Sequence, residues 1–528
     1  MGKNVIQIAC GQIVDFPQVN HRRWWYLLLA MGLLLQVCAV ATSDLGLDAH
    51  VRLNVALDES ETGQDYPWGP TRYDAEQTYE TTSSGGYDGY IGPWFVSEFA
   101  VKIGALTGLL VLVTMAGIVP RWRREGLGQS YDPRWGALVA WSPPLVFATG
   151  RGYDEVFLCI FFGLSIFPLM IADASKPSTR RLTCTLMATS VVLVLAWKGF
   201  AMDISLLAFC GVLVAGWLWD FVDGRLSLKH QTPATQRPWL MATWAAGTTL
   251  VCLVVFGLTQ FNGTLGVLRD QPVTFLFAFL LAIIDGVGIF ILVGFCLWPF
   301  CAPLLKSARG AVGHSITMVT TFVAVLCVSL LFYIASLWVF EANLWNASVL
   351  ETAFLLGNNG RYLTLLILPL IFILHLLHEQ AEPSTDVDRA VNKRALLLGL
   401  LLILPFTLFT SLVGQQLWTE EAGGELDEYL GENSTFLFVA EPSLAVHLMY
   451  SLKTHIDLSG EENISAIWSN PSDATMLLDG GNNISYVLVA PDTNYVPLNS
   501  TLIHSGDTPL TFTQPWTTPT WSIFRIQS

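Results

Sequence analysis

The chain has few charged residues for its length. Only 13% of its 528 residues are Asp, Glu, Lys or Arg, and 52% are hydrophobic. Soluble proteins are about a quarter charged. So little charge over so long a chain excludes a soluble enzyme and a disordered chain. The class that remains is a polytopic membrane protein.

Basic residues are scarcer than acidic ones. The chain has 27 Lys and Arg against 42 Asp and Glu, which gives a formal net charge of −15. A nucleic-acid-binding protein is expected to carry a basic surface. We therefore expect no nucleic-acid partner.

Cysteine is missing where an exported domain would use it. The last of the nine cysteines is Cys327, so the final 110 or so residues have none. This excludes a disulfide framework there, and no CxxC pattern indicates a metal site. An exported domain without cysteine is more typical of archaea and bacteria than of the eukaryotic secretory lumen.

Long apolar runs are abundant. Each is close to the length that crosses a hydrocarbon core of about 30 Å. The third run is short and contains Pro143-Pro144. The eighth carries Asp285, and an acid inside a span is a functional-site hypothesis by default. The sequence predicts eleven spans, near residues 24–42, 95–119, 135–150, 155–172, 183–200, 204–222, 239–260, 272–300, 312–339, 362–378 and 395–417.

The basic residues predict the orientation, because cytoplasmic loops are enriched in Lys and Arg. With the N-terminus inside, 18 of the 27 fall in inside segments. The acids divide the other way, so the outer side is strongly acidic. We predict a multi-pass protein of the plasma membrane with a cytoplasmic N-terminus and an extracytoplasmic C-terminus. The first span also resembles a signal peptide, but its long preceding segment favours a retained helix.

Two domains are expected. Residues 1–417 form the multispan membrane domain, and residues 418–528 form a small, β-rich α+β domain outside. Turn signals separate short strand-like runs within the second domain. These runs are 435–440, 445–452, 464–468, 474–478, 485–490, 510–513 and 521–526. The first outer loop, 43–93, is longer than most connections between helices.

The first outer loop begins with candidate catalytic acids. Asp44 and Asp48 directly follow the first span, and His50 and Arg52 come next. If the stretch is helical, a spacing of four places both carboxylates on one face. Partial desolvation at the membrane surface would raise a carboxyl pKa, which suits a general base, and two carboxylates could share a divalent cation. The alternative is that both acids only mark where polarity resumes after a span.

Two further outer loops carry charge between spans. The second contains Arg151, Asp154 and Glu155 beside Gly150 and Gly152. An arginine there could hold a phosphate by charge-assisted hydrogen bonds, and glycine lets a ligand approach the backbone. The alternative is a salt bridge in a tight turn.

The fifth outer loop ends in Arg361-Tyr362 at the start of a span. A cation and free backbone N–H groups at a helix start suit an anionic head group. The alternative is a pair of side chains that snorkel to the membrane interface.

This plan resembles the GT-C-type membrane glycosyltransferases. The features that carry the resemblance are about eleven spans, the acids Asp44 and Asp48 after the first span, the second acidic loop, and an outer C-terminal domain that ends in the aromatic-rich strand 521–526. The resemblance implies a polyprenyl-phosphate sugar donor and an acceptor that is a glycan, a lipid or a protein. It also implies transfer at the outer face of the lipid bilayer with inversion at the anomeric carbon.

The resemblance also implies roles for these residues. Asp44 or Asp48 would be the general base. Arg151 or Arg361 would stabilise the leaving phosphate. Asp154 and Glu155 would position the acceptor or a metal, and His50 joins the candidate substrate-binding group in the first loop. The resemblance assigns no definite cofactor, and a divalent cation (Mg²⁺ or Mn²⁺) stays open.

The sequence departs from the family in two ways, and two other functions stay open. The first-loop acids are four residues apart rather than adjacent, and the Trp-Trp-Asp motif of oligosaccharyltransferases is absent. A transporter should show polar residues near the midplane and matching broken helices. A non-catalytic scaffold would need only an outer binding domain. Convergence of the acids and Arg361 would favour the enzyme.

Overall fold

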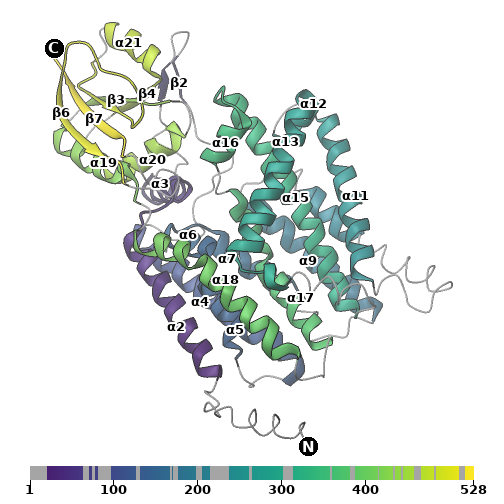
Figure 1. The fold of residues 1–528 in the computed structure, drawn as a ribbon. Coiled ribbons are helices and arrows are strands. Elements are labelled where there is room, and N and C mark those ends of the chain that lie inside the picture. Colours follow the sequence, from purple (N-terminus) through teal and green to yellow (C-terminus); the bar gives the residue numbers. More distant parts are fainter. Residues whose placement is uncertain are drawn as a thin grey trace, which may run out of the picture.

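The computed structural model is a bundle of apolar helices with a small α+β domain at one end (Figure 1). It describes residues 21–62, 71–73, 78–80, 97–125, 131–166, 169, 176–197, 205–214, 237–260, 264–300, 313–356, 359–380, 387–413, 416–431, 434–441, 444–456, 465–480, 483–509 and 518–527.

Six helical stretches in the described residues are long and apolar enough to cross a membrane. They include α2 (His21–Thr42), α4 (Glu98–Glu125), α11 (Pro238–Thr259), α13 (Pro272–Ala282) with η3 (Ile283–Gly294), α15 (His314–Leu344), and η4 (Asn359–Leu366) with α17 (Ile367–Gln380). Other apolar helices are α7 (Glu155–Ile166), α9 (Pro177–Trp197), Ser205–Val214 and α18 (Val387–Leu412). Each predicted span overlaps a helix, but the count of eleven stays a prediction.

The third predicted span is two short helices instead of one. These are α5 (Pro133–Ala140) and α6 (Pro143–Gly150), because Pro143-Pro144 supplies no N–H for the preceding turn. Side chains of neighbouring helices satisfy the carbonyls at the break. Gln36 Nε2 donates to Ala140 O at 3.0 Å, and Thr407 Oγ1 donates to Trp141 O at 3.0 Å. Such partners make a helix break tolerable inside an apolar bundle.

The eighth span does not break at its glycines. It continues from α13 into the π-helix η3, a wider winding that is often found at functional sites. Asp285 lies in the first turn of η3 and packs against the backbone of Gly360, where an added Cβ would lie 2.6 Å from its Oδ2. The intramembrane acid therefore contacts the residue next to Arg361.

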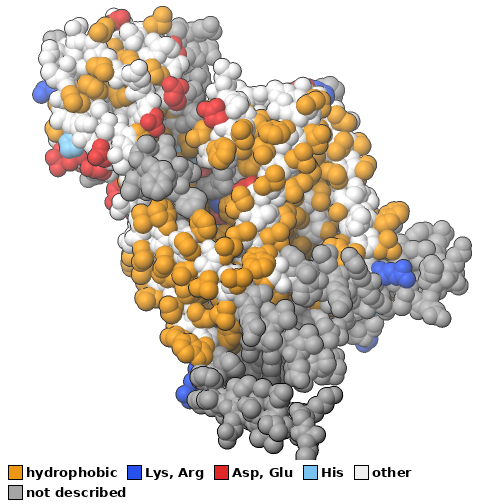
Figure 2. Space-filling view, viewed as in Figure 1, with side chains coloured by type: hydrophobic (Ala, Val, Ile, Leu, Met, Phe, Trp, Pro, Cys, Tyr) orange, Lys and Arg blue, Asp and Glu red, His pale blue; other side chains and the backbone are white. Residues whose placement is uncertain are grey.

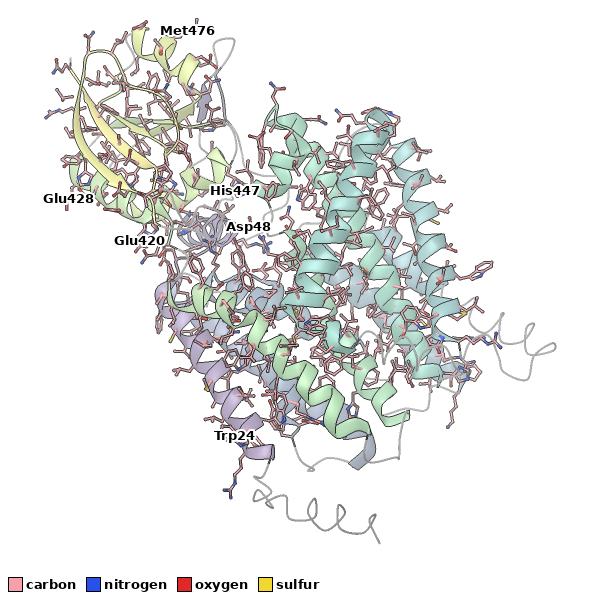
Figure 3. The ribbon with its side chains drawn as sticks, in the orientation of Figure 1. Trp24, Asp48, Glu420, Glu428, His447 and Met476 are labelled. Carbon is pink, nitrogen blue, oxygen red and sulfur yellow. The ribbon has the colours of Figure 1, made fainter. Side chains whose placement is uncertain are left out.

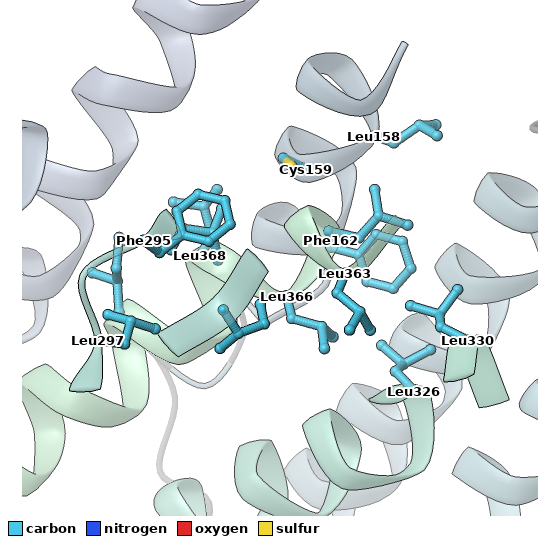
Figure 4. Close-up of a cluster of buried hydrophobic side chains, with 14 of the residues drawn as sticks. Leu158, Cys159, Phe162, Phe295, Leu297, Leu326, Leu330, Leu363, Leu366 and Leu368 are labelled. Carbon is cyan, nitrogen blue, oxygen red and sulfur yellow. The ribbon is translucent and has the colours of Figure 1, made fainter. Parts of the chain in front are cut away.

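The interior of the bundle is apolar and closely packed. Phe162 of α7, Phe295 after η3, Leu326 of α15 and Leu363 of η4 are buried in one cluster (Figure 4). The outside of the bundle is also hydrophobic (Figure 2), with exposed side chains such as Val273. A bundle that is apolar inside and outside is expected when lipid replaces water around it.

The C-terminal domain is built on a mixed sheet. Its elements are α19 (Trp418–Tyr429), β3 (Thr435–Val439), α20 (Ala445–His455), β4 (Ser465–Ser469), α21 (Pro471–Asp479), β5 (Tyr486–Val489), β6 (Ser500–Asp507) and β7 (Thr520–Ile526). The three strands β4, β3 and β5 are parallel, and β7 and β6 add antiparallel strands at one edge. The predicted α+β class agrees with this domain.

Two of the predicted strands are helices. The run 445–452 belongs to α20, where Ala445, Met449, Leu452 and Ile456 are buried at helical spacing. The run 474–478 belongs to α21, which begins with an Asn470 cap and Pro471. The run 510–513 lies outside the described residues.

The first loop contributes to the same domain. Its strands β1 (Thr71–Tyr73) and β2 (Thr78–Glu80) extend the sheet, because β1 pairs in parallel with β4. The full order is β2-β1-β4-β3-β5-β7-β6. The loop also forms α3 (Leu47–Thr62), which lies between α20 and the bundle (Figure 1). The sheet therefore crosses the predicted domain boundary at residue 417.

Candidate functional site

A buried arginine joins three loops at the end of the bundle that carries the C-terminal domain. Arg361 is the third residue of η4, and only 3% of its side chain is exposed. Its Nε donates to Glu155 Oε1 at 2.9 Å, and its Nη2 forms an ion pair with Asp48 Oδ2. A guanidinium suits this position because its planar fork binds two carboxylates at once.

The two acids lie at the starts of two helices. Asp48 is in the first turn of α3, and Glu155 is the first residue of α7. A helix N-terminus stabilises a carboxylate through its free N–H groups. These positions follow from the sequence, in which polar residues resume just beyond each apolar run. The predicted residues Asp48, Glu155 and Arg361 therefore converge.

A second ion pair lies beside the first. Arg52 Nη1 is 2.7 Å from Asp154 Oδ2, and both side chains are almost fully buried. Arg52 follows Asp48 by one helical turn, so both residues of α3 face the second loop. Asp154 and Glu155 are adjacent in that loop. The structure thus brings four of the predicted site residues, together with Arg52, into one ionic cluster.

A tight turn places the second loop against Arg361. Gly152 has φ +67°, a backbone conformation that side-chain-bearing residues rarely adopt, and an added Cβ would lie 2.6 Å from Val101 Cγ1. The turn brings the Tyr153 ring to 4.2 Å from Arg361 Cζ. Arg151, one residue before the turn, lies over the Phe147 ring at 5.3 Å, and its carbonyl accepts from Gly46 N.

His447 is a neighbour that the sequence does not reveal. It lies on α20, and its Nε2 is 4.0 Å from Asp48 Oδ1. Both side chains appear at the junction of domain and bundle in Figure 3. Burial lowers the pKa of His447, although the nearby Asp48 charge opposes this. The imidazole is therefore neutral near pH 7.

Asp44 and Asp48 do not share a helical face. The helix α3 begins at Leu47, so Asp44 precedes it and the expected spacing argument fails. The Asp44 carboxylate accepts from Leu417 N and hydrogen-bonds the Glu420 side chain at the start of the C-terminal domain. Burial and Glu420 raise the pKa of Asp44 to about 7. Asp44 thus contacts the domain junction.

His50 faces away from Arg361. It is two residues after Asp48, which is about 200° around an α-helix. Its Nδ1 lies 3.1 Å from Thr454 Oγ1 on α20. The next residue on this face is Asn54, whose amide donates to Tyr450 O at 3.0 Å. The predicted grouping of His50 with the phosphate-binding residues is therefore not reflected in its contacts.

The carboxylates of the cluster do not fit a divalent cation as they are arranged. Asp48 and Glu155 both bind Arg361, and Asp154 binds Arg52. A hard cation needs several oxygen ligands free to face it. Mg²⁺ or Mn²⁺ stays a prediction, and no step below is derived through a metal.

Two further groups of polar residues stand at the ends of predicted spans and lie partly outside the described residues. Lys198 and Asp203, which flank the third outer loop, fall in an undescribed stretch. Of the polar residues at the end of the tenth span, His375 is buried in α17, and the side chains of His378 and Glu379 are not described.

No protein-family model and no curated protein matches the chain. The chain is similar to solved structures of ArnT. One is ArnT from Cupriavidus metallidurans bound to undecaprenyl phosphate, at 13% identity and a TM-score of 0.43, covering 94% of this chain and 98% of that chain. The other is the apo state, at 12% identity and a TM-score of 0.39, covering 94% and 97%.

Proposed function

We propose that this protein is an integral membrane glycosyltransferase that uses a polyprenyl-phosphate sugar. The observation that carries the proposal is the buried Arg361, which lies between Asp48 of the first loop and Glu155 of the second. Clusters of buried charge in an apolar bundle are costly, which makes them candidates for functional sites.

Asp48 is the proposed general base. Its Oδ2 binds Arg361, whereas its Oδ1 lies 4.0 Å from His447 Nε2. The acceptor hydroxyl oxygen attacks the anomeric carbon as its proton passes to Asp48 Oδ1. The bond between the anomeric carbon and the phosphate oxygen breaks, and its electron pair leaves with the polyprenyl phosphate. Attack opposite the leaving group inverts the configuration.

Arg361 is the proposed partner of the leaving phosphate. Its Nε and Nη2 bind carboxylates, while Nη1 has no hydrogen-bond partner among the described residues. Negative charge grows on the phosphate as the sugar leaves, so a fixed guanidinium stabilises the transition state more than the ground state. Glu155 and Tyr153 hold the guanidinium in place. Arg151 and Asp154 are proposed to complete the substrate-binding wall.

A transporter or a scaffold fits this arrangement less well. The ionic cluster lies at one end of the bundle, next to the C-terminal domain, rather than at the midplane, where a transported substrate would bind. A scaffold would gain nothing from a desolvated arginine with two acids.

The orientation belongs to the same proposal. We place the start of α2 in the cytoplasm and the C-terminal domain outside, because most Lys and Arg then lie inside. A membrane-impermeant maleimide should label Ser472→Cys in intact cells and Arg23→Cys only after lysis. The reverse pattern would contradict the orientation.

Asp48→Asn tests the base. The full-length protein is reconstituted with radiolabelled polyprenyl-phosphate sugars and with glycan, lipid and protein acceptors, and the transferred sugar is measured. We expect Asp48→Asn to lower the rate about 10²- to 10⁴-fold, because the amide cannot accept the proton.

The matched control is Asp270→Asn. Asp270 also pairs with an arginine, at 2.8 Å from Arg269 Nε, but the pair is exposed. The transfer rate of Asp270→Asn should equal that of the wild type. Wild-type transfer by Asp48→Asn would remove Asp48 as the base, and no transfer from any donor by the wild type would remove the enzyme proposal.

A further inference from the structure

Three potential metal ligands meet where the C-terminal domain rests on the bundle. They are His50 of α3, Glu98 at the first residue of α4, and His455 at the last residue of α20. Their ligand atoms all lie within 4.8 Å of one another. Among the described residues, this is the one group of three or more His, Cys, Asp or Glu side chains that is so arranged.

Each of the three side chains has a buried polar atom without a hydrogen-bond partner among the described residues. His50 Nε2, His455 Nε2 and Glu98 Oε1 are shielded from solvent and make no hydrogen bond. The His50 side chain as a whole is 0% exposed. A buried polar atom without a partner costs about 1–3 kcal/mol. Three such atoms in one group of side chains indicate a shared partner.

The hydrogen bonds of His50 determine which of its nitrogens is available. The Thr454 hydroxyl donates to Tyr450 O at 3.0 Å and accepts from Asn54 Nδ2 at 2.9 Å. Its remaining contact, with His50 Nδ1, must therefore be one that it accepts. The proton is on Nδ1, and Nε2 presents its lone pair to the group. Metal-binding histidines typically have such a partner on their other nitrogen.

The charges around the group are mixed. Glu98 is a member, and Asp44 acts on His455, while Lys102 and Arg151 act on His50. Burial lowers the pKa of both histidines, so both imidazoles are neutral near pH 7. Neutral imidazole is the form that binds a metal ion. The two rings pack edge to face with centroids 5.5 Å apart, which is also how they would pack without a metal.

We propose that His50 Nε2, His455 Nε2 and a Glu98 carboxylate oxygen bind a divalent cation of the zinc class. Two imidazoles and one carboxylate are a common zinc ligand set, with water as the fourth ligand. Ligands about 2.1 Å from tetrahedral zinc lie about 3.4 Å apart, so small side-chain rotations close the group. The ion would tie α3, α4 and α20 together, which fastens the C-terminal domain to the bundle. This site is separate from the Arg361 cluster.

Metal content is the first test. Wild-type protein purified from zinc-supplemented cells should carry about one zinc per chain, measured by inductively coupled plasma mass spectrometry. His50→Ala, His455→Ala and Glu98→Gln should each lose nearly all of it. His504→Ala is the matched control, because His504 pairs with Glu425 at 3.1 Å in the same domain. Zinc that is absent from the wild type, or unchanged in the three variants, would overturn the proposal.

A second variant leaves all three ligands in place. Thr454→Val removes the acceptor of His50 Nδ1, and loss of such an outer partner typically weakens metal affinity about 10–100-fold. A role in packing alone predicts no change in zinc affinity. Affinity is measured by competition with a chromophoric chelator, so an equal affinity would contradict the tautomer assignment and the site.

Cobalt provides a readout that needs no variant. Co²⁺ added to chelator-treated wild type should give the intense visible bands of a four-coordinate site, and added Zn²⁺ should bleach them. Zinc should also raise the melting temperature of this protein, because a ligand that binds only the folded state stabilises it. Weak, six-coordinate bands and an unchanged melting temperature would overturn the proposal even if every variant failed to fold.

Discussion

At the scale of the residue, Arg361 has two distinct tasks. It neutralises Asp48 and Glu155 in a buried site, and its remaining nitrogen is the proposed contact for phosphate. The first task stabilises the fold, because an unpaired buried carboxylate is strongly unfavourable. The second task concerns the reaction, so the two should separate in a conservative variant.

Arg361→Lys should reduce transfer more than stability. Lysine keeps the positive charge but loses the planar fork, so it cannot bind both carboxylates and a phosphate. We expect the transfer rate to fall about 10²- to 10³-fold, measured as above, with a retained though lowered melting temperature. Arg269→Lys, in the exposed pair with Asp270, is the control. An equal rate in the two variants would argue against a phosphate contact.

Sequence identified this site in part, for a physical reason. Asp48, Glu155 and Arg361 stand at the ends of apolar runs, where a charge is conspicuous. Arg52 belongs to the cluster but was given no role, and His447, which lies 4.0 Å from Asp48, was missed. Their role depends on which face of α3 and α20 points inward, and His447 lies in a run that was predicted as a strand. A short apolar run is compatible with both the helical period of about 3.6 residues and the strand period of about 2, so the sequence does not distinguish them.

At the scale of the element, the second loop is positioned by close backbone contacts. Gly46 N donates to Arg151 O at 2.9 Å, and a Cβ on Gly46 would lie 2.3 Å from Tyr153 Cζ. A methyl group at position 46 therefore does not fit unless the Tyr153 ring moves. The Tyr153 ring in turn lies against the Arg361 guanidinium. The close approach of the Gly46 backbone to Tyr153 therefore also determines the position of the Arg361 side chain.

Gly46→Ala should therefore impair the reaction without touching a reacting group. The added methyl displaces Tyr153 and with it Arg361, and a shift of about 1 Å can cost about 100-fold in rate. The transfer assay measures it. Gly424→Ala in α19 is the control, since an added Cβ there meets nothing within 4 Å. A Gly46→Ala rate equal to this control would show that the ring is not a positioning element.

The predicted spans coincide with helices, whereas two of the predicted strands do not coincide with strands. A run of about 20 apolar residues has one interpretation, because only a helix satisfies its own backbone in lipid. The interruption at Pro143-Pro144 was visible, but its consequence depended on Gln36 and Thr407 from distant helices. The addition of β1 and β2 to the terminal sheet was not predictable, because strand pairing over such a separation leaves no local pattern.

At the scale of the whole molecule, Asp44 makes the junction of domain and bundle sensitive to pH. Its pKa is raised to about 7 by burial and by Glu420. A raised carboxyl pKa means that the folded state favours the protonated form. The contribution to stability is complete below the unfolded pKa near 4, and it is lost as the pH rises through about 7.

Asp44→Asn should remove this dependence. As the pH rises from 5 to 7.5, the melting temperature of the wild type should fall relative to that of Asp44→Asn. Asparagine can accept a hydrogen bond from Leu417 N and donate one to Glu420, but it does not titrate. His50, His447 and His455 have lowered pKa values and act in the opposite direction below about pH 6.5. The Asp44 charge raises the pKa of His455, so the effect of this one histidine differs between the two proteins. A constant difference across the range would exclude Asp44 as the titrating group.

The sheet that joins β1 to β4 also sets the order of biogenesis. β1 begins at Thr71 and β4 at Ser465, so about 390 residues are made between the two strands. At about 5–20 residues per second, the ribosome needs roughly 20–80 s for that stretch. During this time α3 has been made but α20 has not, so Asp48 lacks its neighbour His447. A ribosome that stalls before α20 would therefore leave an inserted bundle with no activity.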